Sequence, residues 1–534
     1  MTKRQLLLGN EAFALGAIHA GMSGAYAYPG TPSTEILEFV QRDPIAKERG
    51  VHSHWSANEK TAVEEALGMS FAGRRAIAAM KHVGLNVAAD PFVNSAMTGA
   101  NGGLIVVAAD DPSMHSSQNE QDSRFYGAFA RIPVLEPADQ QEAYDMAAYG
   151  FELSEKYATP VLLRLVTRLA HSRAAVATVG EPAPENPMSN PDKPARWVLM
   201  PANSRRRYPE VLDTYNALED AASTRFTHLT DGPDHGIGIV ASGIAWNYVM
   251  EAFGGECPYP ILKVAQYPIP QKLLRQLADS CKSVMVVEEG QPVIEESLRG
   301  IGTPDGFVRG RYTGELPRTG ELSVESVRRA FGIAAAPVPT TPEAVTPRPP
   351  ALCQGCGHRD VFHALNDTLS GYESPKVFGD IGCYTLGYLA PFRAIDTVVD
   401  MGASITMAKG ASDAGQHPAV AVIGDSTFTH SGMTGLLDAI NENSNITVVI
   451  SDNLTTAMTG GQDSQGTGKL RDICIGLGAD PEHVVEIDAS PRKVAEMAEV
   501  FRREIDHDGL SVIIAARECL QTARRHNSSK TRRS

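Results

Sequence analysis

A glycine–aspartate pair and an asparagine, separated by one helix, could together bind a metal ion and a phosphate group. Gly424 and Asp425 follow the apolar run Ala419–Ile423, and the glycine-rich turn after them opens a helix whose N-terminus favours phosphate. Asn453 ends the next apolar run and can supply a second oxygen to the same ion, since Mg²⁺ typically takes one or two protein oxygens beside phosphate oxygens. The pattern predicts a diphosphate site with Mg²⁺, although an aspartate that only caps the helix is the alternative.

Four of the seven cysteines are candidate metal or cluster ligands. Cys353 and Cys356 form a Cys-x-x-Cys motif, which by itself fits zinc, a redox pair, an iron–sulfur cluster or chance. Cys383 follows a Gly-Asp-Ile-Gly turn and Cys519 follows the last apolar run, so in a parallel α/β domain these turns could meet at one edge. Four thiolates is the number that a [4Fe–4S] cluster takes.

Apolar β-branched runs alternate with helix-like segments, which predicts parallel sheets covered by helices. The runs are 76–80, 104–109, 160–165, 238–241, 284–287, 419–423, 447–450 and 511–515. Two proline-rich segments, 181–195 and 336–350, interrupt this order and should form extended linkers. They predict α/β units at 1–180, 196–335 and 351–520, followed by a frayed basic tail at 521–534.

Composition excludes several classes of protein. A chain of 534 residues is expected to form more than one domain. The net charge of -15 argues against nucleic-acid binding, and no apolar run approaches the roughly 18 residues that would span a bilayer. The first apolar run is too short for a signal peptide, so a cytoplasmic location is expected.

Two loops carry a family resemblance. The run 452–462, Asp-Asn-Leu-Thr-Thr-Ala-Met-Thr-Gly-Gly-Gln, is similar to the Asn-x-x-x-x-Met-Thr-Gly-Gly-Gln loop of 2-oxoacid:ferredoxin oxidoreductases, which are thiamine diphosphate enzymes. The run 28–33, Tyr-Pro-Gly-Thr-Pro-Ser, resembles their Tyr-Pro-x-Thr-Pro-Ser loop, and the similarity is greatest to the indolepyruvate branch. The implied Mg²⁺ ligands are Asp425, Asn453 and the Thr455 carbonyl. The implied cofactor contacts in this part are Gly424, Ser426, Asn453, Thr455, Met458 and Thr459, with Ser426 standing where the general motif has glycine.

Thiamine chemistry also needs a carboxylate against the aminopyrimidine ring. A predicted helix has Glu59 near its start and Glu64 and Glu65 as rivals, and the resemblance favours Glu59. It also implies cofactor contacts from a Gly-Leu loop, Gly84 and Leu85, after the next strand. Thr31 is expected to face the substrate. The polar stretch 109–124 closely resembles one in the indolepyruvate branch, so His115, Gln118 and Arg124 are expected to contact the substrate or its carboxylate.

The resemblance implies an α/β fold in which two thiamine diphosphate-binding modules flank a domain like the C-terminal domain of transketolase. The implied activity is oxidative decarboxylation of a 2-oxoacid, such as indolepyruvate or phenylpyruvate, to the acyl-coenzyme A. Electrons would leave through a [4Fe–4S] cluster held by Cys353, Cys356, Cys383 and Cys519. A homodimeric core and a second subunit of about 200 residues are expected. The printed sequence carries no further cysteine-rich ferredoxin-like region, so a separate ferredoxin or flavin subunit is expected to accept the electrons.

Two other functions remain open from the sequence. A non-oxidative thiamine decarboxylase or carboligase shares the order of the modules and needs no cysteines. A cofactor-binding scaffold that only organises a complex would need no activating glutamate.

Overall fold

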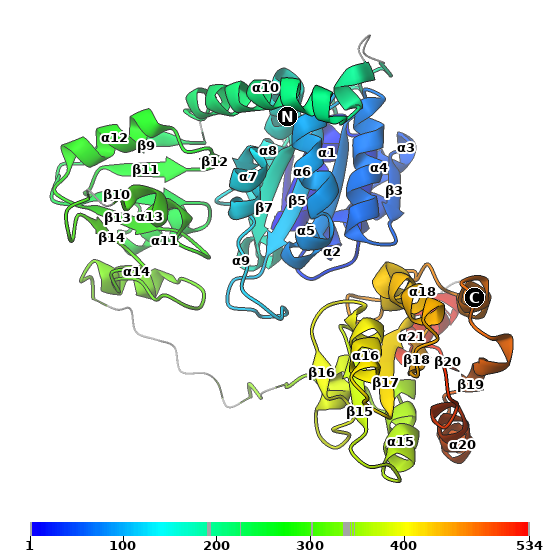
Figure 1. Ribbon diagram of the computed structural model, residues 1–534. Helices are drawn as coiled ribbons and strands as arrows, with labels where there is room; N and C mark the ends of the chain where they lie inside the picture. Colours follow the sequence, from blue (N-terminus) through cyan, green and yellow to red (C-terminus); the bar gives the residue numbers. More distant parts are fainter. Residues whose placement is uncertain are drawn as a thin grey trace. The chain divides into compact units, whose positions relative to one another are not determined.

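The computed structural model describes residues 3–189, 194–224, 226–300, 303–334, 342, 344–346 and 348–531, and the chain divides into two compact units, 1–339 and 340–534 (Figure 1). Unit 1 holds a first module and a middle domain, and unit 2 holds a single module. The structure confirms the predicted α/β class, with a sheet-based module before and another after the middle α/β domain in the sequence.

The first module is built on a seven-stranded sheet with the order β12-β6-β7-β5-β4-β2-β3, parallel except for β12. Its strands are β2 (Gly24–Ala27), β3 (His52–Trp55), β4 (Ala76–Lys81), β5 (Leu104–Asp110), β6 (Val134–Leu135), β7 (Val161–Val166) and β12 (Gln266–Tyr267). Alternate side chains of β4 and β5 enter two hydrophobic cores, one on each face of the sheet. This burial on both faces explains why these strands are continuous apolar runs in the sequence.

Helices cover both faces of this sheet. They are α1 (Gly9–His19), α2 (Thr34–Arg42), α3 (Pro44–Glu48), α4 (Glu59–Phe71), α5 (His82–Val87), α6 (Ala89–Thr98), α7 (Arg124–Ala130), α8 (Gln140–Tyr157) and α9 (Thr167–His171). Helices α1 and α8 contribute to one core, while α4 and α6 contribute to the other. The strands β1 (Lys3–Leu8) and β8 (Arg173–Thr178) form a separate antiparallel pair.

The middle domain has a five-stranded sheet with the order β14-β13-β10-β11-β9, in which only β9 is antiparallel. Its strands are β9 (His228–Thr230), β10 (Gly238–Ser242), β11 (Ile261–Val264), β13 (Val284–Val287) and β14 (Val308–Arg309). Its helices are α11 (Ala245–Ala252), α12 (Gln271–Ser280), α13 (Val293–Leu298) and α14 (Val324–Ala330). Strand β12 lies within the sequence of the middle domain but pairs with β6 of the first sheet, so backbone hydrogen bonds connect the middle domain to the first module.

Most of the described part of the predicted linker 181–195 is extended and packs on the first module. Within residues 181–189, Glu185 accepts hydrogen bonds from Ser23 and Arg74 of that module. The following turn η1 (Pro194–Trp197) and helix α10 (Pro201–Ala221) also pack there, through stacking of Trp197 on Phe71 at 4.2 Å. Helix α10 therefore packs on the first module, whereas the predicted boundary at residue 196 grouped it with the middle domain.

Unit 2 is a six-stranded, all-parallel sheet with the order β16-β15-β17-β18-β20-β19. Its strands are β15 (Lys376–Gly379), β16 (Thr397–Val398), β17 (Ala419–Gly424), β18 (Thr447–Asp452), β19 (Val484–Asp488) and β20 (Ser511–Ala516). Its helices are α15 (Gly357–Leu369), α16 (Ala403–Asp413), α17 (Asp425–Thr427), α18 (Met433–Asn441), α19 (Leu470–Gly476), α20 (Val494–Ile505) and α21 (Leu520–Thr531). Short helical turns lie at η2 (Cys383–Tyr388), η3 (Phe428–Gly432), η4 (Pro481–His483) and η5 (Pro491–Lys493). Two hydrophobic cores again lie on opposite faces of the sheet.

The predicted frayed tail is largely helical. Helix α21 spans most of 521–534, and Arg525 donates a hydrogen bond to the carbonyl of Gly460. The tail therefore belongs to the folded part of unit 2. The predicted linker 336–350 lies mostly outside the described residues. Among the helices that are described, none has the length and apolar character needed to cross a membrane.

Candidate active site

The predicted activating glutamate lies at the carboxyl edge of the first sheet. Glu59 is the first residue of α4, which Asn58 caps by accepting a hydrogen bond from the Thr61 amide. Its side chain is buried, and a Cβ placed on Gly84 would lie 2.6 Å from Glu59 Oε1. A side chain at position 84 would therefore collide with the Glu59 carboxylate, so this position requires glycine. The structure brings together these two residues, which the sequence assigned to one site from different elements.

Neither rival carboxylate on α4 occupies a comparable position. Glu64 is exposed and pairs with Lys60, and Glu65 is exposed and accepts a hydrogen bond from Ser56. Both carboxylates face solvent, whereas an activating carboxylate has to meet the cofactor ring away from bulk water. Leu85, a predicted cofactor contact, is fully buried in one hydrophobic core of the module.

The loop that carries Thr31 meets the polar loop after β5. Ser116 Oγ donates a hydrogen bond of 3.3 Å to the Thr31 carbonyl, and Thr31 itself is partly exposed. Both loops follow strands of the same parallel sheet, so both lie at the edge where Glu59 lies. His115 is exposed and its Nε2 is 2.9 Å from Glu321 of the middle domain, while Gln118 is exposed. The structure thus leaves Thr31, His115 and Gln118 accessible.

Arg124 has a structural environment that argues against the predicted substrate contact. Its guanidinium group is buried and makes two hydrogen bonds to Asp122, at 2.9 and 2.6 Å, and one to Glu288 at 2.8 Å. Although burial alone would raise it, Arg124 and Arg164 hold the pKa of Asp122 well below its usual range. The donors of Arg124 are already used to join the first module to the middle domain. We therefore correct its assignment from substrate contact to a structural ion pair.

The predicted diphosphate turn lies at the carboxyl end of β17. Gly424 ends the strand and Asp425 begins a helical segment that continues through α17, a π-helical turn and α18. A Cβ on Gly424 would lie 2.8 Å from the ring of Tyr384, so this glycine is needed for packing of that ring. Ser426 follows in the first helical turn and is partly exposed. The strand–turn–helix order predicted from the sequence is confirmed.

Asp425 carries an unused acceptor at this turn. Within the part of the chain that the structure describes, its buried Oδ2 atom has no hydrogen-bond donor. Burial raises the pKa of Asp425 to about 7, and the nearby carboxylate of Asp452 adds to the rise. A buried carboxylate oxygen without a partner fits a divalent cation, which would supply the missing positive charge.

The end of the neighbouring strand β18 supplies the second predicted oxygen. Asn453 Oδ1 accepts a hydrogen bond of 3.2 Å from the Thr455 amide. The loop that follows is closed by hydrogen bonds from Thr455 Oγ1 to the Gln462 carbonyl, 2.8 Å, and from Thr459 Oγ1 to Gln462 Oε1, 2.6 Å. Met458 is half-exposed at the tip. This loop would hold Asn453 and the Thr455 carbonyl beside Asp425 for a diphosphate-bound Mg²⁺.

His358 is a site residue that the sequence did not predict. It follows the Cys-x-x-Cys motif, is buried, and lies 3.1 Å from Ser451 Oγ through Nδ1 and 3.4 Å from Asn453 Nδ2 through Nε2. Burial lowers the pKa of His358 to about 4, so the ring is neutral at pH 7 and Nε2 can accept from the amide. His358 thereby orients Asn453 from the turn that carries Cys356. Its position directly after Cys-Gly was the available signal.

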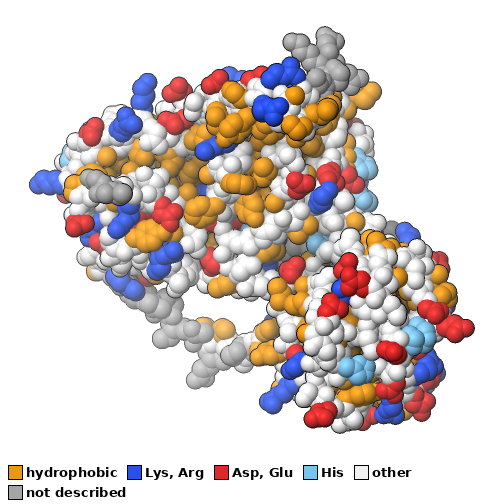
Figure 2. Space-filling view, viewed as in Figure 1, with side chains coloured by type: hydrophobic (Ala, Val, Ile, Leu, Met, Phe, Trp, Pro, Cys, Tyr) orange, Lys and Arg blue, Asp and Glu red, His pale blue; other side chains and the backbone are white. Residues whose placement is uncertain are grey.

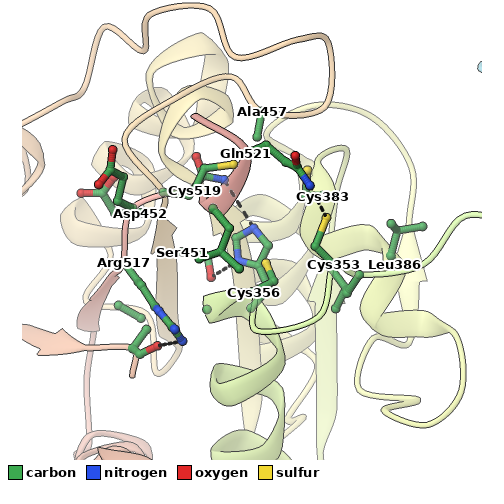
Figure 3. A pocket seen from close by; sticks show the side chains of 18 of the residues that line it. Cys353, Cys356, Cys383, Leu386, Ser451, Asp452, Ala457, Arg517, Cys519 and Gln521 are labelled. Carbon is green, nitrogen blue, oxygen red and sulfur yellow. Dashed lines mark hydrogen bonds between the residues drawn. The ribbon is translucent and has the colours of Figure 1, made fainter. Parts of the chain in front are cut away.

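All four predicted cluster cysteines line one cavity of about 100 Å³ in unit 2 (Figure 3). Cys353 and Cys356 lie just before α15, Cys383 begins the turn η2, and Cys519 precedes α21. Asn453 lines the same cavity. The cavity therefore joins the cysteines to the predicted metal site within a single module.

The electrostatics of the cavity reflect the closeness of the sulfur atoms. Burial raises the pKa of the Cys383 thiol to about 12, and Cys356, Cys519, Cys353 and Asp425 add to the shift in that order. Among the described residues, no three histidine, cysteine or acidic side chains converge as ligands of one metal ion. Thiolates of a [4Fe–4S] cluster bind separate irons and surround a volume instead of a point. Four cysteines around one cavity fit that geometry.

Two family models match the two modules that carry these residues. Residues 15–225 match the thiamine diphosphate-binding domain of pyruvate flavodoxin/ferredoxin oxidoreductases, and residues 380–515 match the C-terminal binding domain of thiamine pyrophosphate enzymes. The first match includes Glu59 and the second includes Asp425 and Asn453. The fold and these residues define the catalytic subunit of a thiamine diphosphate-dependent 2-oxoacid oxidoreductase.

Similarity to curated relatives identifies the family within this class. The chain is 39% identical to the indolepyruvate oxidoreductase subunit IorA of Archaeoglobus fulgidus over 97% of its own length and 86% of the relative's. It is also 39% identical to IorA of Pyrococcus horikoshii, with the same shares covered. The 2-oxoglutarate synthase subunit KorA of Methanothermobacter thermautotrophicus is 29% identical over 33% of this chain and 48% of its own. The chain belongs to the IorA family of indolepyruvate oxidoreductase subunits.

Proposed function

We propose that this chain catalyses the oxidative decarboxylation of an aryl pyruvate to its acyl-coenzyme A, using thiamine diphosphate, Mg²⁺ and one [4Fe–4S] cluster. The 2-oxoacid anion and coenzyme A would yield the thioester, carbon dioxide, a proton and two electrons. The names of the IorA relatives favour indolepyruvate or a related aromatic substrate. The cluster would pass the electrons to a ferredoxin or to a flavin-containing partner.

The cavity of unit 2 carries this proposal. Its four cysteines surround a volume that Asn453 also lines, and Cys383 is near enough to Asp425 for the carboxylate to affect its pKa. A cluster in this position would lie next to the metal that binds the diphosphate. This proximity favours oxidation over the non-oxidative decarboxylase alternative, which has no use for the cysteines.

Thiamine diphosphate, when bound, supplies a carbon centre that holds the electrons released by decarboxylation. Each of the two thiamine diphosphate-binding modules would contribute its own residues to cofactor binding. Asp425, Asn453 and the Thr455 carbonyl would bind Mg²⁺, with Ser426, Met458 and Thr459 near the diphosphate. Glu59 would hold a proton at the aminopyrimidine ring, and Thr31 would face the substrate.

Exposed hydrophobic side chains support assembly with other chains. Phe125 and Phe129 lie one helical turn apart on α7 and are 44% and 75% exposed. Figure 2 shows hydrophobic side chains gathered on a face of unit 1. Surfaces of this kind commonly mark protein contacts. A homodimeric core with a smaller second subunit, in the cytoplasm, stays the prediction made from the sequence.

An anaerobic assay of the native complex tests the proposed function. Phenylpyruvate or indolepyruvate should reduce a redox dye only when coenzyme A is present. We expect Glu59→Gln to lower kcat more than about 100-fold, because the variant cannot exchange a proton with the cofactor ring. The matched control is Glu64→Gln on the exposed face of the same helix, which should retain the wild-type rate.

Two outcomes would overturn this proposal. Dye reduction by the Glu59→Gln complex at the wild-type rate would favour a scaffold role. Release of an aldehyde from the 2-oxoacid without dye reduction would favour the non-oxidative decarboxylase.

A further inference from the structure

Lys81 is a buried cation without an ion pair. It ends β4, and its ammonium group donates hydrogen bonds to the carbonyl of Ser116 at 2.6 Å and to Ser116 Oγ at 3.3 Å. An ammonium group has three donors, and the third has no partner among the residues that the structure describes. No described carboxylate forms an ion pair with it.

This environment is unusual within the chain. The other buried cations of the described residues all contact carboxylates; they are Arg124, Arg164, Lys263, Arg311 and Lys409. Isolated buried charges are costly, so proteins generally pair them. Among the buried cations of the described residues, Lys81 is therefore the one that can still form an ion pair with an anionic ligand.

Asp111 is the acidic residue that affects the pKa of Lys81, and its carboxylate already accepts hydrogen bonds from other groups. Asp111 accepts hydrogen bonds from the Ser116 amide at 2.8 Å, from Ser117 Oγ at 2.6 Å and from Thr167 Oγ1 at 2.7 Å. Burial lowers the pKa of Lys81 to about 8, with Asp111 opposing the shift. At pH 7 the lysine thus remains mostly charged, and its third donor is not used by Asp111.

Lys81 lies among the residues of the candidate active site. A Cβ on Gly30 would lie 2.9 Å from Lys81 Cβ, so the loop leading to Thr31 packs on the lysine stem. Ser116, which accepts from the ammonium group, also donates to the Thr31 carbonyl. Three residues after Lys81, Gly84 contacts Glu59. The ammonium group therefore lies at the sheet edge that carries both Thr31 and Glu59.

We propose that Lys81 binds the carboxylate of the 2-oxoacid substrate and selects for that group. This inference rests on the proposed function, since it assigns a residue to the charged end of that substrate. Arg124, the cation that the sequence offered for this role, is occupied by Asp122 and Glu288. Ser116 would hold the ammonium group before substrate arrives, and the substrate carboxylate would take the remaining donor.

Two inhibitors of nearly the same shape, one a carboxylate anion and one a neutral amide, test this role in the native complex. We expect Lys81→Met to weaken inhibition of phenylpyruvate oxidation by 3-phenylpropanoate on the order of 100-fold, as for loss of a charged hydrogen bond. Inhibition by the neutral 3-phenylpropanamide should change less than about 3-fold. Lys81→Arg should keep the preference for the carboxylate. The control is Lys47→Gln, an exposed lysine of the same module, which should change neither constant.

The outcomes separate this inference from the proposed function. If the wild-type complex oxidises no 2-oxoacid, the proposed function fails. If it does, and Lys81→Met still prefers the carboxylate inhibitor or weakens both inhibitors equally, only the role of Lys81 is overturned. Should Lys81→Met be inactive, calorimetric binding of the two inhibitors to the cofactor-loaded complex gives the same comparison without turnover.

Discussion

Buried charges occur in two different settings in this chain. Between the first module and the middle domain, Arg124 and Arg164 contact four buried carboxylates, Asp110, Asp122, Glu136 and Glu288. At the carboxyl ends of β4 and β17, Lys81 and Asp425 are buried and form no ion pair among the described residues. In the first setting, here called the closed setting, each charged group contacts oppositely charged groups of the protein. In the second, here called the open setting, Lys81 and Asp425 can still pair with a charged ligand.

Pairing, and not burial, distinguishes a structural charge from a functional one here. Removing one member of a closed set leaves its partners buried and uncompensated, which destabilises the fold. Neutralising an open charge removes a cost from the unliganded protein, but it also removes the attraction for the ligand. The two settings therefore predict opposite effects of substitution on stability and on binding.

The largest expected effect is on binding at the open setting. Asp425→Asn should lower the affinity for thiamine diphosphate in the presence of Mg²⁺ by more than about 100-fold, because the metal loses its carboxylate ligand. The free energy of unfolding of the cofactor-free chain should not decrease. Calorimetric titration and urea unfolding measure the two quantities, with Asp438→Asn as the control, because Asp438 is an exposed carboxylate of α18. Unchanged cofactor affinity would remove Asp425 from the site.

The closed setting should respond with lost stability. Arg124→Met should lower the free energy of unfolding by about 3–5 kcal/mol, since Asp122 and Glu288 would remain buried without their cation. Urea unfolding of the full chain, followed by circular dichroism, measures the loss. A stable variant with a raised KM for the 2-oxoacid would instead restore the substrate contact first expected from the sequence.

A smaller effect should appear as a pH dependence of the free energy of unfolding, caused by Glu289 next to the closed setting. Burial raises the pKa of Glu289 to about 7, above the value for an unfolded glutamate, despite the opposing effect of Arg311. The folded state then binds more protons between pH 4.5 and 7, so stability falls as pH rises through this range. Glu289→Gln should flatten the decrease by about 3 kcal/mol, since a pKa change of one corresponds to about 1.4 kcal/mol. If the free energies of unfolding of the wild-type chain and of Glu289→Gln changed with pH in the same way, Glu289 would not be the group responsible.

The sequence predicted the central strands better than the edge strands. Strands such as β5 and β18 are buried on both faces and appear as continuous apolar runs. The edge strand β3 is polar at three of its four positions, and the edge strand β19 has polar residues at alternating positions, so neither gave a comparable signal. The prolines of the predicted linker at 181–195 indicate an extended chain but not what that chain packs against, so the contacts of Glu185 with the first module could not be predicted.

Site residues within short motifs could be predicted, whereas their ion pairs could not. Glu59, Asp425 and the four cysteines each follow a recognisable strand or turn. The environment of Arg124 depends on Glu288, which lies 164 residues away in the sequence, and only the tertiary structure shows that contact. The same limit hid Lys81, whose importance lies in the absence of an ion pair among the described residues.

Reduction of the cluster by substrate is the most direct test of the proposed chemistry. We predict that phenylpyruvate and coenzyme A, added to the anaerobically purified complex without an acceptor, produce the electron paramagnetic resonance signal of a reduced [4Fe–4S] cluster. Cys383→Ala should abolish that signal, while replacement of the buried Cys474 of α19 by alanine should keep it. Absence of iron and labile sulfide from the wild-type complex, or full substrate oxidation by Cys383→Ala, would contradict the oxidoreductase mechanism.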